Sequence, residues 1–142
     1  MDKKKDLASK LRTSGLRPTK QRIKLAEFLF NRDKTFHFTV ENLDRAINKK
    51  NSEDKIALAT IYNTVHAFKK ARHLKEILIK EGKSYFDTNT SSHHHFYDEV
   101  NNELTDIENN KIELKKFPTP PRGKSIKDVN VIINIDNDNQ KH

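Results

Sequence analysis

A helix-length apolar stripe followed directly by a short hairpin constrains the fold of this chain more than any other feature. Apolar residues recur at helical spacing between Ala57 and Ala71, and the stripe consists of Leu58, Ile61, Val65 and Phe68. Alternating apolar residues then flank a turn at Glu81-Gly82-Lys83, a pattern typical of two antiparallel strands. The segment therefore predicts one amphipathic helix with a hairpin behind it.

Two further helices are predicted before this segment. The first covers residues 18–31, where Pro18 suits the first turn and Asn31 suits the C-terminal cap. The second begins at Thr39, whose hydroxyl can accept a hydrogen bond from a free amide, and is expected to end near Asn51. Three helices and a hairpin indicate a winged helix.

The pattern changes to short strands from Ser91 onward. Strands are predicted at residues 93–97, 104–107 and 129–135, with a proline-rich loop at 117–123 and one short helix near Lys111. We therefore predict an α+β protein, in which an N-terminal winged-helix DNA-binding domain is followed by a small α/β dimerisation domain. The expected boundaries are 1–87 for the DNA-binding domain, 88–135 for the dimerisation and effector-sensing domain, and 136–142 for a polar tail.

The composition favours a nucleic-acid partner. The 142 residues carry a formal net charge of +8, and lysine and arginine that neutralise phosphates release condensed counterions. Only 33% of the residues are hydrophobic while 34% are charged, so a thin core is expected to be completed by dimerisation. Neither a secretory signal nor a membrane span is evident, and we expect a cytoplasmic protein that does not contact a membrane.

The polar faces of the 57–71 helix supply the candidate DNA readers. Tyr62 offers a ring to thymine methyl groups, and Asn63 can pair bidentately with adenine. Thr60 and His66 lie beside them and are expected to reach phosphates. The basic residues expected to hold the DNA backbone include Arg17, Arg22, Lys75 and Lys83. The alternative is that Tyr62 simply packs at the edge of its helix.

Three consecutive histidines, His93 to His95, are the candidate ligands of a metal ion or heme. The chain contains no cysteine, so its side-chain ligands are expected to be nitrogen and oxygen atoms. On a strand, His93 and His95 would point to one face and His94 to the other. The alternative is a solvated histidine run in a loop, without a ligand function.

Four motifs occur in a fixed order between Gly15 and Ile107. They are Gly15-Leu16-Arg17-Pro18-Thr19-Lys20-Gln21-Arg22, Leu58-Ala59-Thr60-Ile61-Tyr62-Asn63-Thr64, Tyr85-Phe86-Asp87-Thr88-Asn89 with the triple histidine, and Glu103-Leu104-Thr105-Asp106-Ile107. Together they resemble the ferric uptake regulator family, and more narrowly its iron response regulator (Irr) branch. Asn63 stands where the family usually has arginine and is similar to the Irr form. The likeness extends to the final apolar strand at Ile135.

This resemblance implies a homodimeric repressor or activator of iron and heme genes that binds double-stranded AT-rich operator DNA. It implies that His93, His94 and His95 bind heme. It also implies an interdomain metal site made of His37, Glu81, His93 and His95, and a possible second metal site made of His94 and Glu113. The effector stays open between heme and a divalent ion such as iron, manganese or zinc.

The chain departs from the family pattern in two places. The paired Cys-x-x-Cys motifs of many relatives are absent, so no structural cysteine-bound zinc is expected. Arg72 stands where relatives usually have a glycine, in a left-handed position that costs a residue with a Cβ about 1 kcal/mol.

A metal-dependent hydrolase is the weakest alternative function, because no His-Glu-x-x-His motif occurs, and we expect that the protein is not an enzyme.

Overall fold

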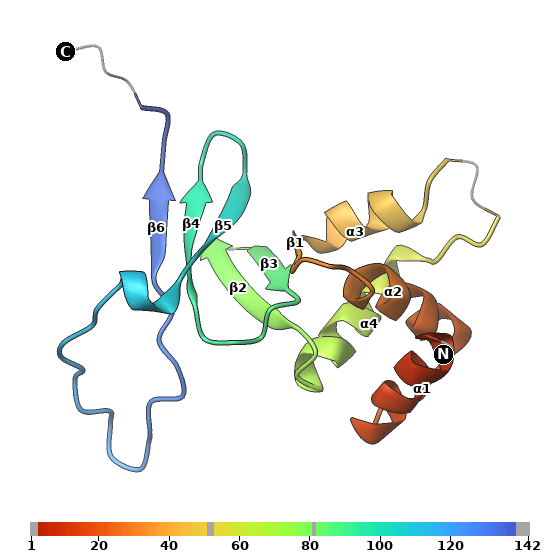
Figure 1. Ribbon diagram of the computed structural model, residues 1–142, viewed down its shortest axis with the longest axis horizontal. Helices are drawn as coiled ribbons and strands as arrows, with labels where there is room; N and C mark the ends of the chain where they lie inside the picture. The colour runs from red at the N-terminus through yellow and green to blue at the C-terminus, as the bar shows by residue number, and fades with distance from the viewer. Residues whose placement is uncertain (1–2, 51–52, 81, 139–142) are drawn as a thin grey trace. The chain divides into compact units, whose positions relative to one another are not determined.

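The computed structural model describes residues 3–50, 53–80 and 82–138. The chain divides into two compact units, Met1–Thr90 and Ser91–His142. Within the described residues, the first unit holds helices α1 to α4 and the sheet β1-β3-β2, whereas the second holds the sheet β5-β4-β6 and one 3₁₀ turn (Figure 1). The fold is the expected α+β arrangement, with a winged helix in the first unit.

The helices of the first unit share one apolar core. They are α1 (Lys3–Thr13), α2 (Lys20–Phe30), α3 (Val40–Ile47) and α4 (Leu58–Lys70). Helix α2 packs against both α1 and α4, and α3 packs against α4. The centre of this core is completely shielded from solvent and includes Leu25, Ala26, Phe38, Leu43, Ile61, Val65 and Phe68.

Side-chain caps fix where α2 and α3 begin. The Thr19 hydroxyl accepts a hydrogen bond from the Arg22 amide, so α2 starts at Lys20 and Pro18 lies just outside it. Thr39 and Asn42 form a reciprocal capping box at the start of α3. Asn31 caps the end of α2, as the sequence predicts.

Helix α3 ends earlier than the sequence predicts. Its last residue is Ile47, because the Asn48 side chain turns to bond both backbone groups of Ile56, at 2.6 Å to the carbonyl and 2.7 Å from the amide. This clamp fixes the residues just before α4. Helix α1 was not expected from the sequence, and it contributes Leu7 and Leu11 to the core.

The sheet of the first unit carries the predicted hairpin. Strands β2 (Lys75–Lys80) and β3 (Lys83–Asp87) are antiparallel, and the short strand β1 (His37–Phe38) pairs with the other edge of β3. The register places His37 opposite Asp87 and Phe38 opposite Phe86. Two residues distant in the sequence, His37 and Asp87, are therefore neighbours on this sheet.

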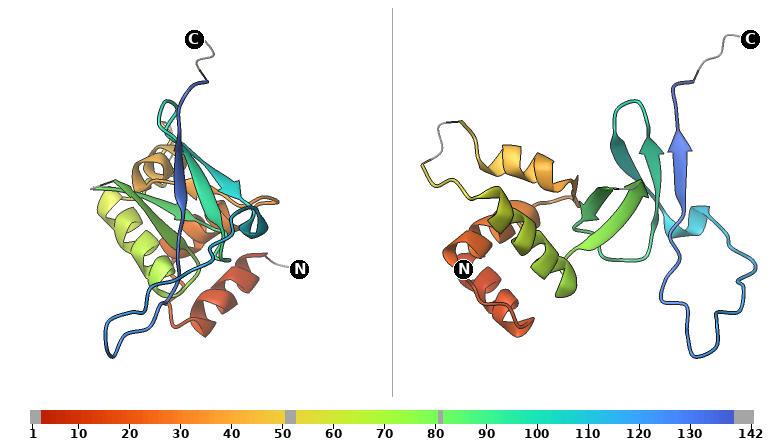
Figure 2. Two further views of the ribbon diagram at one scale, coloured as in Figure 1. Left: turned by 90° about the vertical axis from the view of Figure 1, so that its left-hand side faces the viewer. Right: turned by 180° about the vertical axis from the view of Figure 1, so that it is seen from behind.

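The second unit is built around the histidine-bearing strand. Strand β4 (His94–Asp98) pairs antiparallel with β5 (Glu103–Ile107) and parallel with β6 (Ile132–Ile135), as Figure 2 shows from two sides. The predicted helix near Lys111 is a single 3₁₀ turn, Asn109–Lys111. The last strand starts three residues later than predicted at 129, since Val129, Asn130 and Val131 still belong to the long loop that follows this turn.

Candidate nucleic-acid surface and metal centre

Helix α4 presents one buried face and one polar face. Ile61, Val65 and Phe68 are fully buried, whereas Tyr62 is 54% exposed and Asn63 is exposed beside it. The role of Tyr62 as a DNA reader stays a prediction, beside the alternative that it packs at the edge of its helix. The expectation that Leu58 belongs to the buried stripe is wrong, because Leu58 is 53% exposed. It lies in the first turn of α4, between the buried core residues Ile56 and Ile61 in the sequence.

The ring of Tyr62 is held from behind by other aromatic side chains. Its centroid lies 4.3 Å from that of His66, and His66 meets Phe86 edge-on at 5.6 Å. Phe86 in turn stacks on Phe38 at 5.8 Å. His66, which was predicted to reach a phosphate, is half-buried within this stack and connects an exposed tyrosine to the core.

The residue after the end of α4 adopts the left-handed backbone conformation that glycine usually provides, although it is an arginine. Arg72 has a φ of 67°, which is the left-handed conformation. The Arg72 amide donates to the Lys69 carbonyl at 2.9 Å, and the His73 amide donates to the Phe68 carbonyl at 2.8 Å. These two bonds make a complete Schellman motif, so the helix exit is preserved despite the arginine.

The predicted backbone-binding residues lie on several elements of the first unit. Arg17 is exposed before α2, and the Arg22 guanidinium donates to the Arg17 carbonyl at 3.1 Å. Lys75 is on β2, Lys83 is on β3, and Thr60 is half-buried in the first turn of α4. Their roles as DNA contacts stay predictions.

An ion pair joins α4 to the hairpin on the same side as His66. Lys69 bonds to the carboxylate of Glu76 on β2. Burial raises the pKa of Glu76, but hydrogen bonds from Lys69 and Ser84, with the charges of Lys69 and His66, bring that pKa below its usual value. Glu76 is therefore ionised at neutral pH and anchors α4 to the hairpin.

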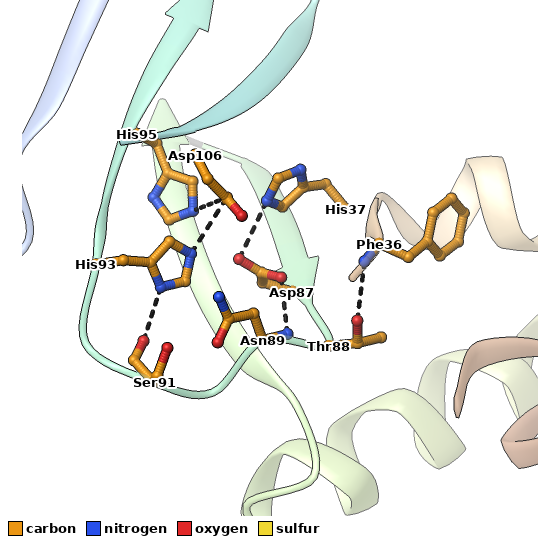
Figure 3. Close-up of polar contacts among 9 residues, drawn as sticks. All are labelled: Phe36, His37, Asp87, Thr88, Asn89, Ser91, His93, His95 and Asp106. Carbon is orange, nitrogen blue, oxygen red and sulfur yellow. Dashed lines mark hydrogen bonds and ion pairs between the residues drawn. The ribbon is translucent and has the colours of Figure 1, made fainter. Parts of the chain in front are cut away.

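His37 and Asp87 form the candidate metal-binding pair of the first unit. The His37 Nε2 lies 3.1 Å from the Asp87 Oδ2, and a dashed line joins these two labelled residues in Figure 3. Asp87 is fully buried, and its other oxygen accepts the Asn89 amide at 2.9 Å. The pair faces away from the hydrophobic core residue Phe38, since neighbouring residues of β1 point to opposite faces.

The second unit brings His93 and His95 to one carboxylate. Asp106 Oδ1 lies 3.2 Å from the His93 Nε2 and 3.3 Å from the His95 Nε2 (Figure 3). Both histidines are buried, and their rings lie 4.4 Å apart. The ligand atoms of these three residues lie within 4.8 Å of one another, which is compact enough for one metal ion.

Hydrogen bonding sets the tautomer of His93. Its Nδ1 lies 2.7 Å from the Ser91 carbonyl, which can only accept, so Nδ1 carries the proton. In the neutral ring, Nε2 then has a lone pair directed at a carboxylate that also only accepts. A cation bound among these atoms would resolve this repulsion, and a second-shell carbonyl on the other nitrogen is the usual arrangement for a metal-binding histidine. The donor set fits a divalent ion.

The sequence of this chain matches the model of one protein family over most of its length. The model of the ferric uptake regulator family matches residues 13–134. The chain belongs to the ferric uptake regulator family. The family resemblance seen in the sequence is thus confirmed, while the narrower Irr assignment stays a prediction.

Individual family members agree with this assignment. The chain is 32% identical over 107 residues to the ferric uptake regulation protein of Campylobacter upsaliensis, covering 75% of this chain and 67% of that one. It is also 32% identical over 97 residues to the peroxide-responsive repressor PerR of Staphylococcus epidermidis, covering 68% of this chain and 62% of that one. The chain thus spans about two thirds or less of the length of these family members.

Solved structures of family members share the fold. The Vibrio cholerae ferric uptake regulator superposes with a TM-score of 0.70 at 21% identity, covering 91% of this chain and 98% of that one. The Pseudomonas aeruginosa ferric uptake regulator with manganese superposes with a TM-score of 0.67 at 21% identity, covering 92% of this chain and 97% of that one.

No helix in the described part of the chain has the length and apolar character needed to cross a bilayer.

His94 differs from its two neighbours, as alternation along a strand requires. Its Nδ1 accepts a hydrogen bond from the Val131 amide at 3.0 Å, just before β6. In the neutral ring the proton is then on Nε2, so no lone pair is left for a metal. His94 and Glu113 lie in no group of three or more metal-ligating residues among the described positions. The second metal site predicted from the family gains no support.

Two carboxylates near the candidate metal centre were not predicted as ligands from the sequence. One residue that was predicted as a ligand lies outside the described part of the structure. Asp87 and Asp106 were quoted within motifs but not as ligands; Asp106 falls on the strand predicted at 104–107, whereas no strand was predicted at His37, the partner of Asp87. The strand register places Asp87 opposite His37 and Asp106 opposite His95, and so brings each carboxylate next to a histidine. Glu81, which the family resemblance implies as a metal ligand, lies outside the described residues.

Hydrogen bonds to Asp98 close the turn between β4 and β5. Asp98 accepts from the Val100 amide at 2.9 Å, the Asn101 amide at 3.1 Å and the Asn101 side chain at 3.0 Å. Hydrogen bonds from Asn101 are the main cause of the lowered pKa of Asp98. The turn is organised by a carboxylate.

Proposed function

We propose that this protein is a DNA-binding transcription regulator of the ferric uptake regulator family and is not an enzyme. The observation that carries the proposal is the exposed polar face of α4, with Tyr62 and Asn63 outside a fully buried stripe. A net charge of +8 supplies attraction for phosphates. Membership in a family whose named relatives are regulators and repressors supports the same conclusion.

The DNA partner is proposed to be an AT-rich duplex read in the major groove by α4. Tyr62 would contact thymine methyl groups and Asn63 would pair with adenine, while Arg17, Arg22, Lys75 and Lys83 would hold the backbone. The test is a gel-shift titration of the full chain on duplexes selected from a random pool. Tyr62→Ala is expected to lose specific affinity, and equal affinity of variant and parent at fixed salt would contradict the assignment.

The effector is proposed to be a divalent metal ion bound by His93, His95 and Asp106. His93 and His95 offer imidazole nitrogens, and Asp106 offers a carboxylate, which together suit iron, manganese or zinc. The ion would neutralise the repulsion between these acceptors and so order β4 against β5. The proposal that His37 contributes to the same ion rests on the family resemblance, and Asp87 would then orient its ring.

Heme is less well supported as the effector. Of the three histidines, His93 is 5% exposed, His94 is 4% exposed and His95 is 1% exposed, so a porphyrin has no access to them without rearrangement of β4. His94 is also engaged by the backbone of Val131. The residues present therefore fit an ion better than a macrocycle.

The experiment that separates these effectors is a titration of the selected duplex with protein and, in parallel, heme, manganese, zinc or ferrous iron. We expect a change of DNA affinity with a divalent ion, and its loss in the double variant His93→Ala, His95→Ala. A response to heme alone, or an ion response that survives in the double variant, would overturn the metal proposal.

We also propose that the protein acts as a homodimer through its second unit. This unit leaves several apolar side chains between one third and just over one half exposed, namely Val100, Leu114, Phe117, Ile126, Ile133 and Ile135. Burial of these side chains against a second copy would complete a small core. Sedimentation equilibrium of the parent, with Ile133→Lys as the disrupting variant, measures the mass directly, and a monomeric parent would contradict the proposal.

A further inference from the structure

Leu58 is a leucine in the first turn of α4, and 53% of its surface is exposed. We infer that Leu58 is a specificity-determining residue, which reads the 5-methyl group of thymine in the major groove beside the base contact of Tyr62. This inference rests on the proposed DNA-binding function and adds a residue that the apolar stripe of the sequence had assigned to the core.

The geometry of α4 places Leu58 and Tyr62 together. They are four residues apart, so they lie one above the other, roughly 40° apart around the helix axis. Leu58 is 53% exposed and Tyr62 is 54% exposed, whereas Val65, about 20° from Leu58 in the other direction, is fully buried. Leu58 is therefore exposed although its sequence neighbours Ile56 and Ile61 are buried in the core, and it extends the surface of Tyr62 instead.

The neighbours of Leu58 leave it prominent. Ala57 and Ala59 on either side are exposed and carry only a methyl group. The cap residue Ala57 makes no side-chain hydrogen bond, so no polar side chain covers the start of the helix. Leu58 and Tyr62 are thus the two large exposed side chains in the first half of α4.

The charge of the protein favours nucleic acid as the partner that contacts Leu58 and Tyr62. Helix α4 contains no acidic residue, the exposed Lys69 and Lys70 occupy its last turn, and Lys55 lies before it next to Glu53 and Asp54. The net charge of +8 of the whole chain favours a polyanion as the partner, and two apolar side chains on an otherwise polar helix face match a polyanion that displays isolated methyl groups. In the major groove of duplex DNA, only the thymine of an A·T pair presents such a methyl group.

The test removes that methyl group from the DNA without altering base pairing. The full chain selects its preferred duplex from a random pool, and each thymine in that duplex is then replaced singly by deoxyuracil. For the parent, we expect a loss of about three- to five-fold in affinity at each contacted position. Leu58→Ala is expected to bind the thymine and deoxyuracil duplexes equally at one or more of those positions, next to the positions that depend on Tyr62.

Two control variants show whether a lost thymine preference is due to the Leu58 side chain itself. One keeps an apolar side chain at position 58, and the other removes an exposed leucine on β2. Leu58→Met keeps an apolar side chain and is expected to keep the thymine preference. Leu78→Ala removes an equally large leucine, 65% exposed on β2, and is also expected to keep it. Thermal unfolding of each variant should match the parent, because neither leucine is part of the core.

The outcomes separate this inference from the proposed function. If the parent selects no duplex, the DNA-binding function fails, and the inference fails with it. If the parent selects a duplex but Leu58→Ala keeps the full thymine preference at every position, only the inference is overturned. Loss of the preference in Leu78→Ala rather than in Leu58→Ala would likewise overturn it.

Discussion

The imidazole of His66 supports the phenol ring of Tyr62 from within the helix, at a centroid separation of 4.3 Å. Because His66 also meets Phe86 edge-on, the exposed ring of Tyr62 is attached to the core through it. A side chain that must enter a groove loses less conformational entropy on binding when it is already held in place.

We expect His66→Ala to weaken specific DNA binding by roughly two- to twelve-fold, the usual worth of one aromatic pair. His66→Phe keeps a ring at this position and is expected to retain most of the affinity. Fluorescence anisotropy with the selected duplex at fixed salt measures both variants. Equal binding by His66→Ala and the parent would show that Tyr62 needs no support.

Asp106 is the carboxylate shared by His93 and His95, so its charge is central to the proposed metal centre. Asp106→Asn is expected to lower affinity for manganese or zinc by at least about 10- to 100-fold, the loss usual for an outer-shell carboxylate, because Asp106 is itself a proposed ligand. Competition with a chelating dye provides the measurement. Glu108→Gln, an exposed carboxylate two residues away, serves as the matched control and should bind like the parent.

Arg72 holds a left-handed conformation that glycine adopts without strain. Arg72→Gly is expected to raise the free energy of unfolding by about 0.5–1 kcal/mol, because relief of strain exceeds the added entropy of the unfolded chain. Asn102 has a similar φ of 55°, but it accepts the hydroxyl of buried Tyr97 at 2.8 Å, so Asn102→Gly should lower stability. Urea unfolding distinguishes the two, and the same sign for both would contradict this account.

His73 makes the first unit sensitive to acid. Burial, and then the charge of Lys10, lower the pKa of His73 below its usual 6.5, and its ring lies 2.8 Å from the Ser14 hydroxyl. A lowered pKa means that the folded state resists protonation, so stability is complete above pH 6.5 and falls as the pH drops below it.

The check is urea unfolding of the parent and His73→Gln at pH 7.5 and at a series of lower pH values. The variant keeps a polar side chain near Ser14 but does not titrate, and its stability should fall less than that of the parent below pH 6.5. Parallel decreases in the two proteins would assign the acid sensitivity to other groups.

Local patterns predicted α4 and its hairpin to within about a residue, because the apolar stripe and the Glu81–Lys83 turn are signals contained in one short segment. Helix α1 was missed because only Leu7 and Leu11 among its described side chains are buried, which leaves too weak a stripe in a lysine-rich segment. Leu58 was misassigned because helical periodicity gives the face on which a residue lies and not whether another part of the fold covers it there.

The carboxylates of the site required the structure. Asp87 becomes a partner of His37 through the register of β1 and β3, and Asp106 becomes a partner of His95 through the register of β4 and β5. Strand register is decided by pairing between distant segments, which a single sequence does not display. The alternation of His93 and His95 against His94, in contrast, followed from strand geometry alone and is confirmed.

The bond between Val131 and His94 also sets an order of assembly. The partner that fixes the His94 ring lies 37 residues further along the chain, and β6 forms only when that segment has returned to β4. Such long-range parallel pairing forms slowly compared with a local hairpin such as β4–β5. Until Val131 is available, His94 lacks this hydrogen bond, so the strand that carries the proposed metal ligands is completed by a segment that is synthesised later than β4 and β5.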